Sequence, residues 1–231
     1  MPVFDENFMR EIERNTLGLD DTFQFTCKMC GKCCKNRTEA IVMTGFDIFR
    51  IAQELGRKPL EIVQRYTQFN IGPNSHLPIL TLKENSDGRC GLNHNNRCIV
   101  QKNKPIVCAI YPLGRYYDMR DHKMKYFTQD IGKDCGKPNG KVWTLREWIE
   151  TWQLDKFDAE SDAWNKMLAG LSETARTLTE EQIEDKMMLQ VLLNGMYVAY
   201  DTSKPYVEQV EINMKKLEEL FDHLFHLELK F

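Results

Sequence analysis

The most constraining feature of this chain is a run of four cysteines within eight residues, inside FTCKMCGKCCKNR at 25–37. Its spacing is C-x2-C-x2-C-C. All the cysteines of the 231-residue chain fall between residues 27 and 135, and residues 136–231 contain none. So many thiols in one stretch limit the fold, because they must be cross-linked, bound to metal or buried as small apolar groups. The eight are Cys27, Cys30, Cys33, Cys34, Cys90, Cys98, Cys108 and Cys135.

The rest of the sequence favours metal over disulfides. MPVFDENFMREIERN interleaves acids with bases and lacks an apolar stretch, so it predicts no secretory signal. No apolar run approaches the length of a membrane-spanning helix. The formal net charge of −3 gives no whole-protein argument for nucleic acid or a membrane as partner. We therefore expect a soluble, cytoplasmic protein, and in that reducing compartment clustered cysteines indicate metal or redox chemistry.

The first three cysteines predict the kind of metal centre. Cys27, Cys30 and Cys33 form a continuous C-x2-C-x2-C, a spacing that holds iron–sulfur clusters in bacterial ferredoxins. It favours one or two iron–sulfur clusters, with [4Fe–4S] preferred. Zinc is the alternative, because tetrahedral four-thiolate zinc sites tolerate many spacings. The sequence identifies no catalytic residue and leaves enzymatic activity open.

The next cysteine raises a geometric problem. Side chains of adjacent residues diverge, so we expect Cys33 and Cys34 to serve two centres, or one of them not to be a ligand. Cys90, Cys98 and Cys108 have gaps that suit a loop folded around a centre, and Cys34 could join them. With Cys135 as the eighth thiol, this arithmetic gives two four-coordinate sets. All eight cysteines are therefore candidate metal and cluster ligands.

Basic residues surround the cysteines. Residues 27–37 and 88–108 carry four Lys or Arg each and no acid. Cations of this kind offset the negative charge of a thiolate-bound centre and lower the pKa of thiols. A nucleic-acid-binding zinc module is an alternative interpretation, and we consider it the weaker one. The basic residues are Lys28, Lys32, Lys35, Arg37, Arg89, Arg97, Lys102 and Lys104.

Local signals predict several elements between the cysteine stretches. Thr44 is suited to an N-cap and Gly56 to a helix stop, which predicts a helix between them. Pro59 suits the first position of another helix, KPLEIVQRYTQF at 58–69. Residues 78–83 predict a short strand, and 116–128 predict a hairpin.

The C-terminal part has helical signals throughout. TLRE at 144–147 and TEEQ at 179–182 have the form of capping boxes. The last apolar positions lie on one face of a long helix, which we expect to pack on the other C-terminal helices, with a protein partner as the alternative. Met187, Met188 and Met196 are expected to fill the core. The apolar face of the last helix comprises Val207, Val210, Met214, Leu217, Phe221 and Leu224.

These patterns predict a mainly α protein in two parts. An irregular cysteine-rich metal-binding domain would span residues 1–140, and a helical region would span 141–231. The boundary is set by the end of the cysteines and by the breaker GKPNG at 136–140. Because residues 84–115 hold few apolar side chains, we expect bound metal to contribute to folding.

Three motifs together resemble the CxxCxxCC cysteine-cluster family, described as a zinc- or iron-chelating domain. They are the run at 27–34, the helix FDIFRIAQELG at 46–56, and KPIVCAIYP at 104–112. Lys104 and Ala109 stand where the family has arginine. The resemblance covers residues 25–135 and implies metal binding, which we interpret as a redox or accessory role.

A further alternative comes from similar cysteine-cluster proteins, the flagellin lysine methylases. This resemblance implies an enzyme that modifies a protein or peptide. The chain shows no Gly-rich nucleotide or S-adenosylmethionine loop.

Overall fold

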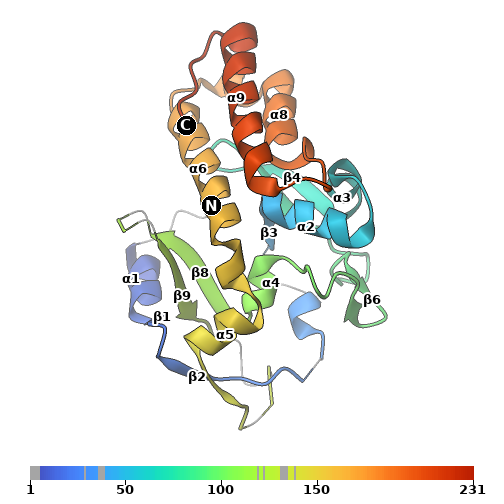
Figure 1. The fold of residues 1–231 in the computed structure, drawn as a ribbon, viewed down its shortest axis with the longest axis vertical. Helices are drawn as coiled ribbons and strands as arrows, with labels where there is room; N and C mark the ends of the chain where they lie inside the picture. Colours follow the sequence, from blue (N-terminus) through green and yellow to red (C-terminus); the bar gives the residue numbers. More distant parts are fainter. Residues whose placement is uncertain are drawn as a thin grey trace.

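Small antiparallel sheets share the N-terminal half of the chain with short helices, and the C-terminal region is helical (Figure 1). The computed structural model describes residues 6–28, 30–35, 40–118, 120–121, 123–130, 135–137 and 139–231. These residues are 47% helix and 19% strand, so the protein is mixed α/β and the prediction of a mainly α protein is wrong. Several strands hold only two or three residues, which is too short for an alternating apolar pattern to reveal them.

The helices are α1 (Glu6–Arg14), α2 (Gly45–Leu55), α3 (Pro59–Tyr66), α4 (Ile106–Ile110), α5 (Leu145–Thr151), α6 (Asp158–Ala175), α7 (Glu180–Ile183), α8 (Lys186–Leu193) and α9 (Tyr206–Phe225), with shorter turns η1 (Lys32–Cys34), η2 (Leu154–Phe157) and η3 (Asn194–Val198). The strands are β1 (Thr16–Leu17), β2 (Thr22–Gln24), β3 (Val42–Met43), β4 (Thr67–Ile71), β5 (Pro78–Leu82), β6 (Asn93–His94), β7 (Arg97–Cys98), β8 (Leu113–Asp118), β9 (Lys123–Thr128) and β10 (Val142–Thr144).

Four small sheets bring distant segments together. Their strand orders are β1-β9-β8, β3-β5-β4, β10-β2 and β6-β7, and all the pairs are antiparallel. The hairpin predicted at 116–128 is confirmed as β8 and β9, and the strand predicted at 78–83 is confirmed as β5. The pairing of β10 with β2 matters most for the cysteines, because it joins the chain after Cys135 to the chain before Cys27.

Capping residues set the helix ends largely as predicted. Thr44 and Thr144 each accept a bond from the backbone N–H three residues on, and Gly56 ends α2 in the left-handed conformation. The helix predicted over 58–69 ends earlier, at Tyr66, and Phe69 lies half-exposed on β4. Near the end of α3, the Thr67 hydroxyl donates to a carbonyl of the last turn, that of Val63.

The C-terminal helices form the larger core with α2, α3 and β5. Helix α9 packs on α6 and α8, as Figure 1 shows at the end of the molecule opposite the β2 loop. Four residues of its predicted apolar face are buried, so the prediction that this face packs internally is confirmed, although Leu224 is exposed. Met188 and Met196 are buried as predicted, whereas Met187 is exposed. The buried four are Val210, Met214, Leu217 and Phe221.

This core includes side chains from both sides of residue 140, such as Phe46 and Leu80 together with Trp164 and Leu217. The division at that residue stays a prediction. None of the helices that the structure describes is both long enough and apolar enough to span a membrane.

Candidate metal centre

The first cysteine stretch leaves the β2 strand at a buried aromatic anchor. Phe25 packs edge-on against Trp148 and Tyr111, with ring centroids 6.1 and 6.0 Å apart. After this anchor the chain is irregular as far as the η1 turn, and Cys27 and Cys30 are exposed there. The anchor therefore fixes where the cysteine run begins while leaving its thiols accessible.

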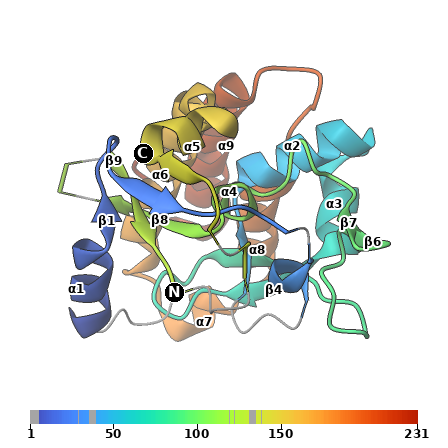
Figure 2. The same cartoon turned by 90° about the horizontal axis from the view of Figure 1, so that it is seen from below.

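Cys135 returns to the same place from far along the sequence. The Lys137 N–H donates to the Thr26 carbonyl at 2.9 Å, and the Cys135 sulfur lies 3.1 Å from the Tyr111 hydroxyl. Burial and then this contact raise the pKa of Tyr111, and the charges of Cys33 and Cys30 raise it further. Cys135 thus lies beside the first cysteine stretch. Figure 2 shows the molecule from below, with α4 near the middle of the view.

A second backbone contact brings Cys34 to the loop that follows β5. The Cys90 N–H donates to the Cys34 carbonyl at 2.8 Å, and Lys35 forms a β-bridge with Arg89. The β6–β7 hairpin pairs Asn93 with Cys98 and so turns the loop back on itself. Cys34 therefore lies beside the segment that carries Cys90, and its role as a ligand of the second group stays a prediction.

The N-terminal end of α4, which carries Cys108, is held by a buried carboxylate. Asp47 is 1% exposed, and its Oδ1 accepts from the Ile106 N–H at 2.9 Å. Its Oδ2 accepts from the Thr44 N–H and hydroxyl at 3.0 and 2.8 Å. One side chain therefore caps α2 and fixes the start of α4, two residues before Cys108.

Electrostatics show which thiols of the second group are neighbours. Burial and then the charges of Cys90, Cys34, Asp47 and Cys98 raise the pKa of the Cys108 thiol. Burial is also the main cause that raises the pKa of Cys98, to which the charges of Cys34 and Cys90 add. These four sulfurs are therefore within electrostatic range of one another.

The side chains of Cys33 and Cys34 were expected to diverge, but they do not. Their sulfurs lie 3.8 Å apart, and this contact is the largest cause that raises the pKa of Cys33, ahead of burial. Zn–S bonds of about 2.3 Å in a tetrahedron give sulfur–sulfur edges of about 3.8 Å. The distance is therefore compatible with one shared ion as well as with two neighbouring centres.

Lys104 lies between the two cysteine groups. Its Nζ is 3.8 Å from the centroid of the Trp152 ring, a cation–π contact. Burial lowers the pKa of Lys104, and the charges of Cys108 and Cys98 from one group and of Cys33 and Cys27 from the other oppose that shift. One ammonium thus faces both groups.

The other basic residues are more peripheral. Lys28, Lys32 and Lys35 are exposed, and Arg89 pairs with Asp87 at 3.1 Å. Arg37 lies outside the described residues.

Sequence reasoning missed three site residues. Tyr111 was not among the predicted site residues, although it contacts Cys135. Trp152 lies in the C-terminal part and carried no signal for the site, because only tertiary structure brings it to Lys104. Asp47 had a visible signal, since it is the third residue after an N-capping threonine, but nothing in the sequence showed its bond to Ile106.

The donors fit a zinc or iron site in type, and no disulfide joins any of the eight cysteines. Within the described ranges, no three Cys, His, Asp or Glu side chains yet converge as metal ligands. Binding therefore requires the thiols to turn toward a common point. Rotation about one side-chain bond per cysteine is the smallest movement that can do so.

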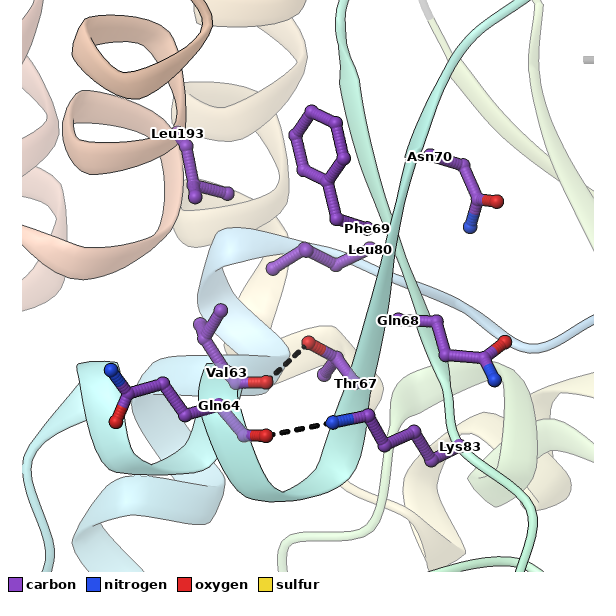
Figure 3. A pocket seen from close by; sticks show the side chains of 9 residues that line it. All are labelled: Val63, Gln64, Thr67, Gln68, Phe69, Asn70, Leu80, Lys83 and Leu193. Atoms are coloured by element: carbon purple, nitrogen blue, oxygen red, sulfur yellow. Dashed lines mark hydrogen bonds between the residues drawn. The ribbon is translucent and has the colours of Figure 1, made fainter. Parts of the chain in front are cut away.

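Two pockets lie outside the cysteine groups. One of about 540 Å³ lies beside the edge strand β4, where Val63, Phe69, Leu80 and Leu193 line its apolar part (Figure 3). A second, of about 470 Å³, lies between the β8–β9 hairpin and α5 and α6. Neither of these two is lined by a cysteine.

Cysteines from four stretches, brought near one another by backbone contacts and flanked by cations, are the pattern of a cysteine-cluster metal-binding domain. Residues 26–135 match the CxxCxxCC family, described as "Putative zinc- or iron-chelating domain". No curated protein and no solved structure matches the chain.

Proposed function

We propose that the eight cysteines form two adjacent thiolate centres and that the protein is an iron–sulfur protein with a redox or accessory role in the cytoplasm. The observation that carries this proposal is a pair of backbone hydrogen bonds: the Lys137 N–H, two residues after Cys135, donates to the Thr26 carbonyl, and the Cys90 N–H donates to the Cys34 carbonyl. The first centre would be held by Cys27, Cys30, Cys33 and Cys135. The second would be held by Cys34, Cys90, Cys98 and Cys108.

The continuous C-x2-C-x2-C run supports iron–sulfur clusters over zinc. When bound, such a cluster supplies one-electron transfer, whereas zinc would supply only structure. The chain's own contribution is to hold the thiols in two groups and to place the Lys104 ammonium against both. That charge offsets thiolate charge, so we expect it to favour the loaded state of both centres.

The deciding experiment measures metal and acid-labile sulfide per chain on anaerobically prepared protein. We expect iron and an equal amount of acid-labile sulfide, divided between two centres that can be removed separately. Cys90→Ser should remove the portion held by the second centre and Cys30→Ser that held by the first. Zinc without sulfide would select a structural domain, and full metal content in both variants would refute the two-centre assignment.

Proton release gives an independent check. Burial or a neighbouring thiol raises the pKa of Cys33, Cys98 and Cys108, so these groups are protonated at neutral pH in the metal-free protein. Metal binding must displace those protons, and affinity should fall as the pH is lowered. Calorimetry in buffers of different ionisation enthalpy measures the release, and a pH-independent affinity would contradict thiolate ligation.

The remaining interpretations stay predictions. A peptide-modifying enzyme requires an open metal position beside a substrate pocket. A nucleic-acid module requires salt-dependent binding through the exposed Lys28, Lys32 and Lys35. A partner protein along α9 would have to contact its exposed side, because the apolar face packs internally.

A further inference from the structure

A cleft of about 470 Å³ lies between the β8–β9 hairpin on one side and α5, η2 and the start of α6 on the other. Figure 1 shows the hairpin beside α5 and α6. The hairpin register sets Arg115 opposite Tyr126 and Tyr117 opposite Met124. Side chains alternate along strands, so these four share one face of the hairpin, the face that lines the cleft. The volume is within the range of small-molecule sites.

The cleft walls carry opposite charges. Arg115 and Lys123 come from the hairpin. Across from them the helical wall contributes four acids and one cation, Arg146, which lies on α5 one turn before Glu150. In the described part of the chain, no ion pair joins the two walls, and the ion pair of Arg146 is with Asp20, which is not a lining residue. The acids are Glu150, Asp155, Asp158 and Asp162.

The contacts within each wall support this separation. Arg115 lies opposite Tyr126 on the hairpin, and burial raises the pKa of that tyrosine while the Arg115 charge lowers it. Burial and then the charges of Asp162 and Asp155 raise the pKa of Asp158. The carboxylates therefore repel one another, and no cation is among the main influences on Asp158. A ligand ammonium would relieve this repulsion.

The floor between the charged walls is apolar. Ile106, Ile149, Leu154 and Phe157 line it. Ile106 is two residues from Cys108 on α4, so the cleft borders the candidate metal centre without including a thiol. A floor of this kind accommodates a methylene chain, and the walls at its two sides would take groups of opposite charge.

We propose that this cleft binds a small zwitterion, with its ammonium group against Asp158 and its neighbours and its carboxylate against Arg115 and Lys123. A phosphate-rich ligand would meet the four carboxylates, and a simple amine would leave the cations unpartnered. The proposal does not depend on the identity of the bound metal.

Calorimetric titration of the full chain with ε-aminocaproate tests it, with caproate and hexylamine as single-charge comparisons. We expect saturable binding of the zwitterion with a dissociation constant below about 10 mM. Arg115→Gln and Asp158→Asn should each weaken it about tenfold, the value of one lost charged hydrogen bond. Lys123→Gln, at an exposed position, serves as the second cation variant if Arg115→Gln fails to fold.

Arg57→Gln and Asp222→Asn are matched controls outside the cleft and should leave the affinity unchanged. Equal binding of hexylamine or of caproate would overturn the proposal in favour of a site for one charge. Absence of saturable binding, or binding that survives both cleft variants, would overturn it as well. Metal content is measured on the same samples, so failure here is separable from failure of the proposed metal centres.

Discussion

Replacement of Asp47 by alanine tests how the site is held together. The carboxylate accepts from the Ile106 N–H at 2.9 Å and from the Thr44 N–H at 3.0 Å, and it is 1% exposed. Asp47→Ala removes the bonds from the Ile106 and Thr44 N–H groups, and it leaves the buried Ile106 N–H without an acceptor. The variant therefore loosens the start of α4 and the cap of α2 in one step.

The magnitude follows from these contacts. A buried N–H without a partner costs about 1–3 kcal/mol, and loss of a helix cap costs about 1 kcal/mol. We expect Asp47→Ala to lower the free energy of unfolding by about 2–4 kcal/mol, a large part of the total for a typical domain.

Urea unfolding of metal-free protein, monitored by circular dichroism, measures the change. Glu147→Ala is the matched control, because Glu147 forms the same capping box on α5 but is exposed and has no bond to another element. We expect that control to cost about 0.5–1 kcal/mol. If Asp47→Ala lowered the free energy of unfolding no more than Glu147→Ala does, the bond that links α2 to α4 would not contribute to stability and the reasoning would be wrong.

Other positions give separate tests. Gly45→Ala should destabilise by about 1–3 kcal/mol, because a methyl group there would overlap the carbonyl of Met196; a melting temperature equal to wild type would contradict the close packing. A hydrogen bond with Arg120 lowers the pKa of Asp118 to about 2. The ionised Asp118 side chain therefore contributes fully to folding stability above its ordinary pKa of 3.8, and this contribution is lost as the pH falls toward 2. Between pH 5 and pH 2 the melting temperature of Asp118→Asn should therefore fall less steeply than that of the wild type. Equal slopes of melting temperature against pH would refute this. Burial raises the pKa of Tyr200 to about 12, so stability should fall as the pH rises from about 10 to 12, and Tyr200→Phe should reduce that fall in alkaline denaturation.

Local signals in the sequence predicted what depends on neighbouring residues. The capping boxes at Thr44, Thr144 and Thr179 and the hairpin before Thr128 follow from contacts only a few residues apart. The break before α8 was not predicted, although Asp185 caps that helix by accepting from the Met188 N–H at 2.7 Å.

Long-range contacts account for what the sequence did not predict. β1, β3, β6 and β7 have two residues each, and a partner strand rather than a local pattern makes them strands. The arithmetic of eight thiols suggested two groups, and this division stays a prediction, although only the fold shows that Cys90 lies beside Cys34. No spacing rule could place Trp152 against Lys104, because these residues meet only when the C-terminal part folds onto the cysteine loops.

The pairing of β10 with β2 has a consequence for biosynthesis. The segments that hold Cys27 and Cys135 come together only after the segment beyond Cys135 has been made and has paired with residues 22–24. At ordinary ribosomal speeds of 5–20 residues per second, residue 135 follows residue 27 by about 5–20 s. During that interval the first thiols are in an unfinished nascent chain, open to oxidation and to the wrong ion. The proposed first centre could therefore be completed only after this later segment has been made, and its first three thiols would have to stay reduced until then.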